Sequence, residues 1–428
     1  MRILLLGADG FIGRHLVASL QARGHAIVPA VRDTARADRL LPAPASIAVD
    51  LNRDTGAQAW LPRLAGIDAV VNCAGILQGS RAQSMRAIHV DAPRALYEAC
   101  ERAGVQRVVL VSAISADAGA GTQYADTKRA GEEALRATPL AWVILRPSLV
   151  HAPGAFGGTA LLRALAALPF AIPVAGDGMQ AFQPIAMDDL CRVVARTLES
   201  AELARRSIDP VGPQVVTLRE LLVDLRRWLG LAPVATVRIP GWMTQVATRI
   251  GGLGSGPMNA TALRQLEYGN TASYERFVAD SGIEALSWNE SLLRHPSQWQ
   301  DRWHARLYFV RPILRAALVL LWAGSGIAGL FAIDAWSVLV GAQFGIGTAS
   351  ATRLLAAACA SDLALAMLLA VNWRPGRVAI AQLGVVAAYS VLASFVAPAL
   401  WLDPFGSLLK NLPILAAILV HGALAVER

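Results

Sequence analysis

Hydrophobic and polar residues divide the chain into two regions of different character. In the N-terminal part, short apolar runs alternate with longer amphipathic stretches, a pattern typical of parallel strands that alternate with covering helices. The runs are apolar at consecutive positions, as a strand buried on both faces requires. The pattern therefore predicts an α/β fold with a doubly wound parallel sheet, whose strands lie at residues 3–6, 26–31, 47–49, 69–73, 108–111 and 142–145.

The C-terminal part contains long apolar runs instead. A helix that crosses a bilayer needs about 20 apolar residues. Four runs approach or exceed this length and predict an all-α domain of four transmembrane helices, at residues 316–333, 354–373, 378–402 and 411–426. The first has 18 uncharged residues and the third has 25, while the second and fourth are apolar except for Asp362 and His421. Residues 335–352 are also uncharged, but their glycines and polar residues favour a loop or a re-entrant segment.

Composition agrees with this division. The mean hydropathy of +0.44 and the 16% of charged residues are too apolar for a soluble enzyme alone. The net charge of +8 does not indicate nucleic acid, because no stripe of basic and aromatic residues accompanies it. If four spans alternate, the arginines near their ends fall on one side, which predicts a multi-pass inner-membrane protein with a cytoplasmic N-terminal domain. These arginines are Arg311, Arg315, Arg374, Arg377 and Arg428.

The N-terminus and the cysteines indicate a reducing compartment. A glycine turn interrupts the first apolar run after Leu6, so we expect no secretory signal. The four cysteines have no CxxC spacing, which predicts neither a disulfide framework nor a metal site.

These patterns predict three segments. Residues 1–205 form a nucleotide-binding domain, 206–308 a substrate or cap region with a linker, and 309–428 the transmembrane domain. Within the second segment, the apolar stretch 239–258 contains several glycines but no cluster of acids, bases or metal ligands. It is either a packed cap or an apolar slot that faces the membrane.

Three glycines at three-residue spacing follow the first strand and lead into a helical pattern. Gly7 permits a tight turn, Gly10 lets the backbone approach a pyrophosphate, and Gly13 lets helix and strand pack closely. Phe11 and Ile12 begin the helix, whose N-terminus is suited to hold the phosphates. This arrangement predicts a Rossmann-type dinucleotide site.

Arg32 bears on the choice of nucleotide. It follows the second strand, where a carboxylate would bind the ribose hydroxyl of NAD but an arginine accommodates the additional phosphate of NADP. We therefore expect NADP(H) in preference to NAD(H). NAD(H) remains an alternative, because the neighbouring Asp33 offers a carboxylate.

Tyr124 and Lys128 carry the candidate chemistry. At positions i and i+4 they share a helix face, so the ammonium can lie near the phenol and favour its ionised form. The phenol could then exchange a proton with a carbonyl or an alcohol, with Ser112 or Ser115 polarising the same oxygen.

In these residues the chain resembles the extended, atypical branch of the short-chain dehydrogenase/reductases. Further matching motifs are Asp50-Leu51, Asn72-Cys73-Ala74-Gly75 and Arg146-Pro147-Ser148. With Gln183-Pro184-Ile185 and Asp188-Asp189-Leu190, they are similar to the NADPH-binding accessory subunits of NADH:ubiquinone oxidoreductase. The resemblance implies that Asp50 and Leu51 contact adenine, and that Ala74, Gly75, Lys128 and Pro147 line the cofactor.

The chain departs from this family at one position. Where the family usually has an asparagine, Asp91 stands, which leaves the usual proton-relay or structural role in question. The nearby His89 is expected to be a packed or solvent-facing helix residue.

The C-terminal region resembles the DoxX-like membrane domains. The matching features include Gly324-Ser325-Gly326, Asp362 in the second span, and Trp401 to Gly406 followed by Lys410 to Pro413. A charged residue such as Asp362 costs about 3 kcal/mol at a bilayer centre. We therefore expect it to accept hydrogen bonds from Ser361 or Tyr389, or to handle a proton.

Two functions fit these features. The first is a membrane-tethered NAD(P)H-dependent oxidoreductase that acts on a hydrophobic small molecule such as a quinone, an isoprenoid or a lipid. The second is a non-catalytic nucleotide-binding module that stabilises or regulates a membrane protein complex. Tyr124 and Lys128 favour the first, and Asp91 favours the second.

Overall fold

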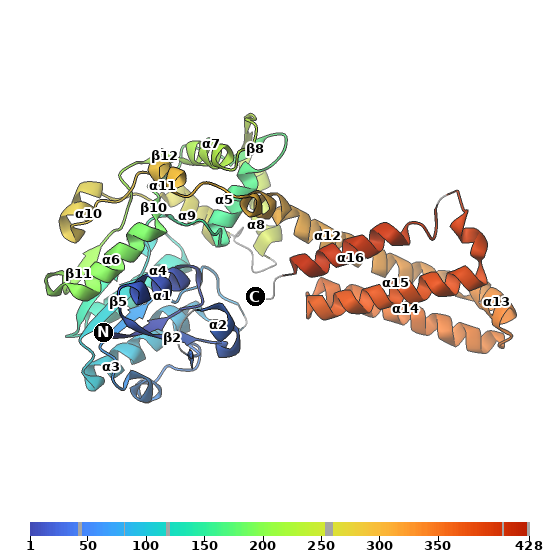
Figure 1. Cartoon of the computed structure of the whole chain (residues 1–428), viewed down its shortest axis with the longest axis horizontal. Coiled ribbons are helices and arrows are strands. Elements are labelled where there is room, and N and C mark those ends of the chain that lie inside the picture. Colours follow the sequence, from blue (N-terminus) through green and yellow to red (C-terminus); the bar gives the residue numbers. More distant parts are fainter. Residues whose placement is uncertain (42–44, 81, 117–119, 253–259, 405, 426–428) are drawn as a thin grey trace. The chain divides into compact units, whose positions relative to one another are not determined.

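The computed structural model describes residues 1–41, 45–80, 82–116, 120–252, 260–404 and 406–425. The chain divides into two compact units, Met1–Ala305 and Arg306–Arg428. Each unit is described by itself below (Figure 1).

A seven-stranded sheet forms the centre of the first unit, in the order β11-β6-β5-β4-β1-β2-β3. All of its strand pairs are parallel. The strand order changes direction at β1 and β4, so a crevice opens at the carboxyl ends of these strands. The predicted parallel sheet is confirmed, and β11 is an addition that the pattern did not predict. The strands are β1 (Arg2–Leu6), β2 (Ala26–Val31), β3 (Ile47–Ala48), β4 (Ala69–Asn72), β5 (Arg107–Val111), β6 (Ala141–Leu145) and β11 (Arg206–Ile208).

Helices cover both faces of this sheet. The successive buried residues of β1 explain why: Ile3 and Leu5 pack in one apolar core, while Leu4 and Leu6 pack in another. The first core is completed by α1 (Phe11–Ala22) and α6 (Met187–Glu199), the second by α3 (Ala92–Ala103) and α4 (Gln123–Arg136). The remaining elements here are α2 (Thr34–Leu40), a π-helical turn (Ala87–Asp91) and 3-10 turns at Ala57–Ala59, Leu61–Leu64, Ile114–Ala116 and Ala201–Leu203.

Apart from α6 and β11, the segments that follow β6 build a cap with its own apolar core. Leu221, Leu222 and Leu225 of α7 pack there with Ile172 and Trp288. Three two-stranded sheets join its parts: β7 with β10, β8 with β13, and β9 with β12. The strands are β7 (Val150–His151), β8 (Ile172–Ala175), β9 (Ala181–Phe182), β10 (Ile185–Ala186), β12 (Val216–Thr217) and β13 (Thr236–Ile239). The helices are α5 (Gly157–Ala166), α7 (Leu218–Trp228), α8 (Gly241–Gly252), α9 (Ala260–Tyr268), α10 (Tyr274–Ser281) and α11 (Trp288–Arg294). Of the apolar stretch predicted at 239–258, residues 253–258 lie outside the described residues.

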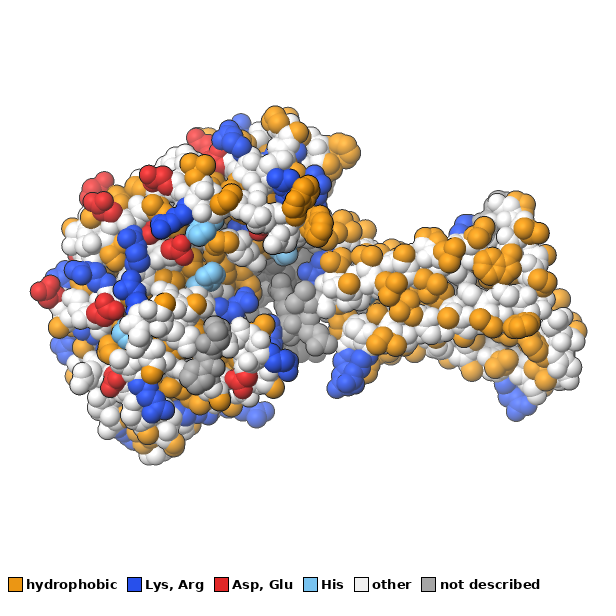
Figure 2. All heavy atoms as spheres, viewed as in Figure 1, with side chains coloured by type: hydrophobic (Ala, Val, Ile, Leu, Met, Phe, Trp, Pro, Cys, Tyr) orange, Lys and Arg blue, Asp and Glu red, His pale blue; other side chains and the backbone are white. Residues whose placement is uncertain are grey.

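The second unit is helical. Its elements are α12 (Trp299–Phe331), which begins in the first unit, α13 (Ile333–Phe344), α14 (Thr348–Ala370), α15 (Pro375–Val396), a 3-10 turn (Pro398–Trp401) and α16 (Asn411–Leu424). Trp322, Leu365, Val386 and Ile418 belong to a shared core of α12, α14, α15 and α16. Hydrophobic side chains also cover much of the visible outer surface, as expected for helices that face lipid (Figure 2).

A helix is present in each of the four predicted spans, but three of the four have the length of a membrane span. Among the described residues, α12, α14 and α15 are long and apolar enough to cross a membrane, whereas α16 is apolar but has 14 residues. Residues 335–352 were predicted to form a loop or a re-entrant segment, and the loop was wrong, because α13 and the first residues of α14 make most of this stretch helical. Its run Trp336 to Val340 continues a helix, and only Gly345, with φ of +65°, ends it.

Packing of α1 against β1 should depend on the absence of a side chain at Gly13. A Cβ atom there would lie 2.0 Å from the Gly7 carbonyl oxygen. We expect Gly13→Ala to cost about 1–3 kcal/mol of stability and to abolish nucleotide binding. Thermal unfolding and nucleotide titration of the full chain in lipid nanodiscs measure both effects. Gly56→Ala is the matched control, since a Cβ at Gly56 meets no atom within 4 Å. Equal behaviour of the two variants would contradict this role for Gly13.

Candidate functional site

The three glycines form the turn that the sequence predicted. Gly7 has φ of +72°, and its N–H donates to the Ala30 carbonyl at 3.1 Å. Gly10 donates to the Gly7 carbonyl at 3.0 Å and precedes α1, with no side chain capping the helix. The first amides of α1, at Phe11 and Ile12, therefore lack side-chain partners and are suited to bind phosphate oxygens.

The turn after β4 lies directly against the glycine turn. Asn72 Oδ1 accepts from the Ala74 N–H at 3.1 Å, and a Cβ on Gly7 would lie 3.0 Å from Ala74. A Cβ on Gly75 would lie 3.1 Å from Lys128 Nζ. The fold thus brings Gly7, Ala74, Gly75 and Lys128 together at the carboxyl edge of the sheet.

Lys128 is buried at the end of β5. Its Nζ donates to the Val111 carbonyl oxygen at 3.1 Å, and burial lowers its pKa to about 8. Tyr124, one helical turn earlier, is half-buried, and burial raises its pKa to about 12. The expected lowering of the tyrosine pKa by the lysine is therefore not found, because desolvation is the cause of the observed shift and it raises the pKa.

Ser112 follows Val111, whose carbonyl holds Lys128. Its side chain is buried, and its Oγ has no hydrogen-bond partner among the described residues. Because an unsatisfied buried hydroxyl is unfavourable, it marks a position where a ligand oxygen could bind. The predicted catalytic residues Tyr124, Lys128 and Ser112 thus come from adjoining elements, β5 and α4. Ser115, the alternative serine, is buried in the 3-10 turn at Ile114–Ala116.

His89 belongs to the surroundings of this site. Its ring meets the Tyr124 ring edge-on, with centroids 5.7 Å apart. Its Nε2 accepts from the Ile76 N–H at 3.2 Å, so Nδ1 carries the hydrogen and donates to Thr127 Oγ1 at 2.9 Å. Burial, with a smaller contribution from Lys128, lowers the His89 pKa to about 3. His89 is thus a neutral, packed residue that holds α4, while Asp91 is partly exposed and pairs with Arg86 at 3.5 Å.

A buried ion network, which sequence reasoning missed, anchors the other end of α4. Glu132 is fully buried and accepts from Arg146 at 2.6 Å and from Arg136 at 2.9 Å. Arg136 also donates to Ser207 Oγ of β11 at 3.1 Å. The signal in the sequence was a carboxylate one turn after Lys128, together with the arginine of the Arg146-Pro147-Ser148 motif. Pro147 of the same motif lies beside the 3-10 turn that follows β5, where its carbonyl oxygen accepts from the Ile114 N–H at 3.3 Å.

The residues predicted to recognise the adenosine end follow β2 and β3. Arg32 is exposed, and its guanidinium lies against the side-chain amide of Gln83. Asp33 instead caps α2, accepting from the Arg36 N–H at 2.9 Å. Asp50 pairs with Arg53 at 3.5 Å, and Leu51 packs in the core on its side of the sheet.

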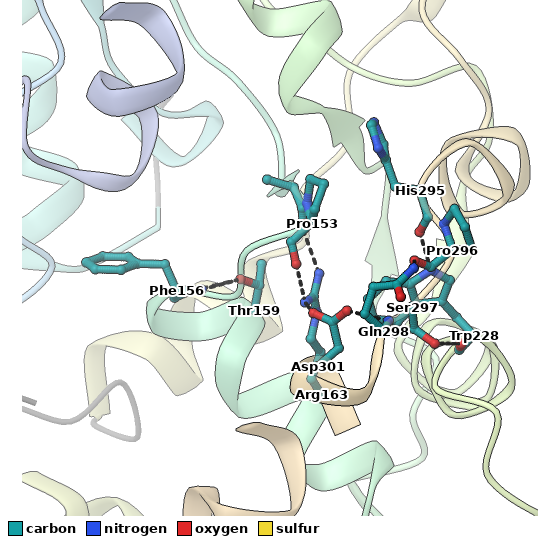
Figure 3. A network of polar contacts seen from close by, with 11 residues as sticks. Pro153, Phe156, Thr159, Arg163, Trp228, His295, Pro296, Ser297, Gln298 and Asp301 are labelled. Atoms are coloured by element: carbon teal, nitrogen blue, oxygen red, sulfur yellow. Dashed lines mark hydrogen bonds and ion pairs between the residues drawn. The ribbon is translucent and has the colours of Figure 1, made fainter. Parts of the chain in front are cut away.

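The segment after β7 contains Phe156 and is held in place by hydrogen bonds from Arg163 (Figure 3). Phe156 stacks on Phe11, with ring centroids 5.7 Å apart. Arg163 of α5 donates to the carbonyls of Ala152 at 2.6 Å and Pro153 at 2.7 Å, and it meets Asp301 of α12 at 3.4 Å. The segment after β7 is therefore connected to the first turn of α12.

Two cavities lie apart from this arrangement. One, of about 490 Å³, is lined by Ile114, Arg146 and residues of α10, and the other, of about 620 Å³, lies between α1 and α6. Neither is lined by Tyr124, Lys128 or the glycine turn. We therefore place the candidate site by the side chains at the carboxyl edge of the sheet and not at these cavities. Across the described residues, no group of three or more His, Cys, Asp or Glu side chains is positioned to hold a metal ion.

Comparison with known proteins identifies the two parts of the chain. Residues 7–164 match the NAD(P)H-binding family and residues 317–419 match the DoxX-like family. The first unit therefore contains an NAD(P)H-binding domain of the short-chain dehydrogenase/reductase type, and a DoxX-like domain follows it.

Individual relatives are reductases or share the fold. The chain is 34% identical to the ceramide reductase of Caulobacter vibrioides over 154 residues, which cover 36% of this chain and 47% of that protein. The match thus spans about half the length of that relative. The chain is 28% identical to the 3-diazoavenalumate denitrifying reductase of a Streptomyces species, covering 59% of this chain and 91% of that protein. The solved structure of MoeE5 with UDP-glucuronic acid and NAD has the same fold, with a TM-score of 0.54, 23% identity and coverage of 71% and 99%.

Lys128 should make the stability of the nucleotide-free protein rise with pH. Its pKa is about 8 in the folded protein, against 10.5 for an ordinary lysine, so between these values the unfolded chain binds more protons. Stability should therefore increase as the pH rises through this window. Thermal unfolding between pH 7 and pH 10, in wild type and Lys128→Met, measures the effect. Identical pH profiles in the two proteins would show that Lys128 ionises like an exposed lysine.

Proposed function

We propose that the protein is a membrane-tethered NADP(H)-dependent oxidoreductase that interconverts a carbonyl and an alcohol on a hydrophobic small molecule. The observation that carries this proposal is the position of Lys128, one helical turn from Tyr124. Its Nζ lies close to Gly75 and donates to the Val111 carbonyl, directly before the partnerless Ser112 hydroxyl. The class of reaction follows from these side chains, and the class of substrate from the membrane domain.

The residues have separate roles in the proposed reduction. A bound reduced nicotinamide supplies the hydride to the carbonyl carbon. Tyr124 gives its proton to the carbonyl oxygen, and Ser112 donates a hydrogen bond to the same oxygen. Lys128 donates one of its three N–H groups to the Val111 carbonyl oxygen. The other two N–H groups would be available to the ribose hydroxyls of a bound nucleotide and to the Tyr124 oxygen. Its charge favours the tyrosinate that remains after proton transfer.

The membrane domain supports a hydrophobic substrate. Three helices of spanning length would hold the enzyme where a quinone, an isoprenoid or a lipid dissolves. One relative is named as a reductase of ceramide, which is itself a lipid.

We further propose that the first unit lies in the cytoplasm at the inner membrane. The support is the arginines at the same ends of alternating spans: Arg311 and Arg315 before the first, and Arg374 and Arg377 between the second and third.

One observation favours the second candidate function, a non-catalytic nucleotide-binding module. Asp91, which stands where the family usually has an asparagine, pairs with Arg86 at 3.5 Å. In this function the first unit binds nucleotide without turnover and stabilises or regulates a membrane protein complex.

Removal of the Tyr124 hydroxyl separates these two functions. For the oxidoreductase, Tyr124→Phe should keep nucleotide binding but lower turnover by about 10²–10⁴-fold. Nucleotide fluorescence measures binding, and NADPH oxidation against a panel of quinones and lipid carbonyls measures turnover, with the full chain in nanodiscs. Tyr268→Phe, at the end of α9, should leave both unchanged. Unaltered turnover in Tyr124→Phe excludes it as the proton donor, and wild-type binding without turnover on the whole panel favours the second function.

Arg32 should select the phosphorylated nucleotide. Its charge-assisted hydrogen bond to the 2′-phosphate would contribute about 1.5–3 kcal/mol. Arg32→Ala should therefore weaken NADPH binding roughly ten- to a hundredfold while NADH binding changes little. Titration of both nucleotides measures this, and Arg39→Ala, an exposed arginine of α2, is the control. Equal losses for the two nucleotides, or no loss, would refute the assignment.

A further inference from the structure

Asp362 occupies a built polar site inside the helical unit. Its side chain belongs to α14 and the residue is only 3% exposed. Ser325 Oγ of α12 donates to Asp362 Oδ2 at 2.7 Å, and Tyr389 OH of α15 donates to Asp362 Oδ1 at 2.8 Å. The expected bond from Tyr389 is present, while Ser325 takes the role expected of Ser361. Three helices therefore converge on one carboxyl group.

No cation balances this carboxyl group. None of the ion pairs among the described residues involves Asp362, and the arginine of its own helix, Arg353, bonds to Ala349 and Ser350. The titratable groups that face it are Tyr389 of α15 and Cys359, one turn earlier on α14. From α12 the facing group is the neutral Ser325. The other two helices of the unit also carry titratable residues: Asp334 of α13, which is exposed, and His421 of α16, which is buried.

An unpaired carboxylate is unfavourable in such surroundings. Removing a charge from water into an apolar medium costs far more than two neutral hydroxyl groups return. A neutral carboxylic acid avoids that cost and still uses both hydrogen bonds, because it has one donor and further acceptor capacity. The burial and the absence of a cation thus favour the acid form.

The same contacts can accommodate both forms. Tyr389 OH lies 2.8 Å from Asp362 Oδ1 and 3.2 Å from the Ala358 carbonyl oxygen, but it has one proton to donate. With a carboxylate, the tyrosine donates to Asp362. With an acid, Asp362 donates to the tyrosine oxygen, and the tyrosine donates to Ala358. The two forms differ by rotation of hydroxyl groups and need no movement of the backbone.

We propose that Asp362 is a reversible proton-binding site in the DoxX-like unit, with Tyr389 and the Ala358 carbonyl as its relay. A proton from water forms an O–H bond with the carboxylate, and release returns that proton to water. Two other polar pairs lie along α15 on either side of Tyr389. Trp322 Nε1 donates to Gln382 Oε1 at 2.9 Å, and Asn411 Nδ2 donates to Ser390 Oγ at 2.8 Å.

Infrared difference spectroscopy of the full chain in nanodiscs, titrated with pH, tests the site directly and needs no nucleotide. We expect a protonated-carboxyl band near neutral pH that disappears at alkaline pH and is absent in Asp362→Asn. Asp334→Asn, an exposed aspartate of α13, should keep the band. A spectrum that lacks the band in wild type, or retains it in Asp362→Asn, overturns the proposal.

Labelling provides a second measurement in case the asparagine variant does not fold. Dicyclohexylcarbodiimide modifies protonated carboxyl groups in apolar surroundings, and peptide mass spectrometry of wild type locates the product. We expect modification at Asp362 near neutral pH that decreases at alkaline pH. Modification that does not depend on pH, or none at Asp362, overturns the proposal.

Tyr389→Phe tests the relay. Its hydroxyl bonds more strongly to a carboxylate than to a neutral acid, so its loss should change the pH range over which the band disappears. An unchanged titration would remove Tyr389 from the proposed site.

Discussion

The packing of α4 against the ends of β5 and β6 is the constraint on which the candidate site depends. Its buried face carries Lys128 and Glu132 one turn apart, and each charge is held by a partner from a different strand end. Between them Gly131 allows contact with the π-helical turn, since a Cβ there would lie 2.1 Å from the His89 carbonyl oxygen. The helix therefore has little freedom to shift or rotate. Because Tyr124 lies on the same helix, these three contacts also fix its position.

This arrangement explains why the site combines rigid and open parts. Both ring nitrogens of His89 are engaged and Lys128 donates to Val111, whereas the Ser112 hydroxyl has no partner among the described residues and no side chain caps α1. Buried polar groups are normally satisfied within a folded protein. The partnerless hydroxyl of Ser112, one residue after the carbonyl that binds the Lys128 ammonium, is therefore the exception to this rule at the candidate site.

Buried polar side chains of the helical unit also form hydrogen bonds with one another, in a segment expected to lie in lipid. Hydrocarbon offers no hydrogen bonds, so each polar side chain among its apolar helices must find a partner in the bundle. Trp322 with Gln382, and Ser325 and Tyr389 with Asp362, are solutions of this kind. The packing also explains small residues on α12: a Cβ at Gly326 would lie 2.8 Å from the Leu363 side chain.

The sequence by itself determined the sheet, the glycine turn, the spacing of Tyr124 and Lys128, and the apolar helices. These depend on residues close together in the chain, where period, turn chemistry and run length act locally. Only the tertiary structure decided the place of His89 beside Tyr124, the ion network of Glu132 and Arg146, and the pairing of Asp362 with Ser325. Those partners come from different elements, and His89 and Thr127 stand 38 positions apart. Periodicity cannot specify such pairs, because they are selected by whichever buried polar groups the packed elements bring within reach.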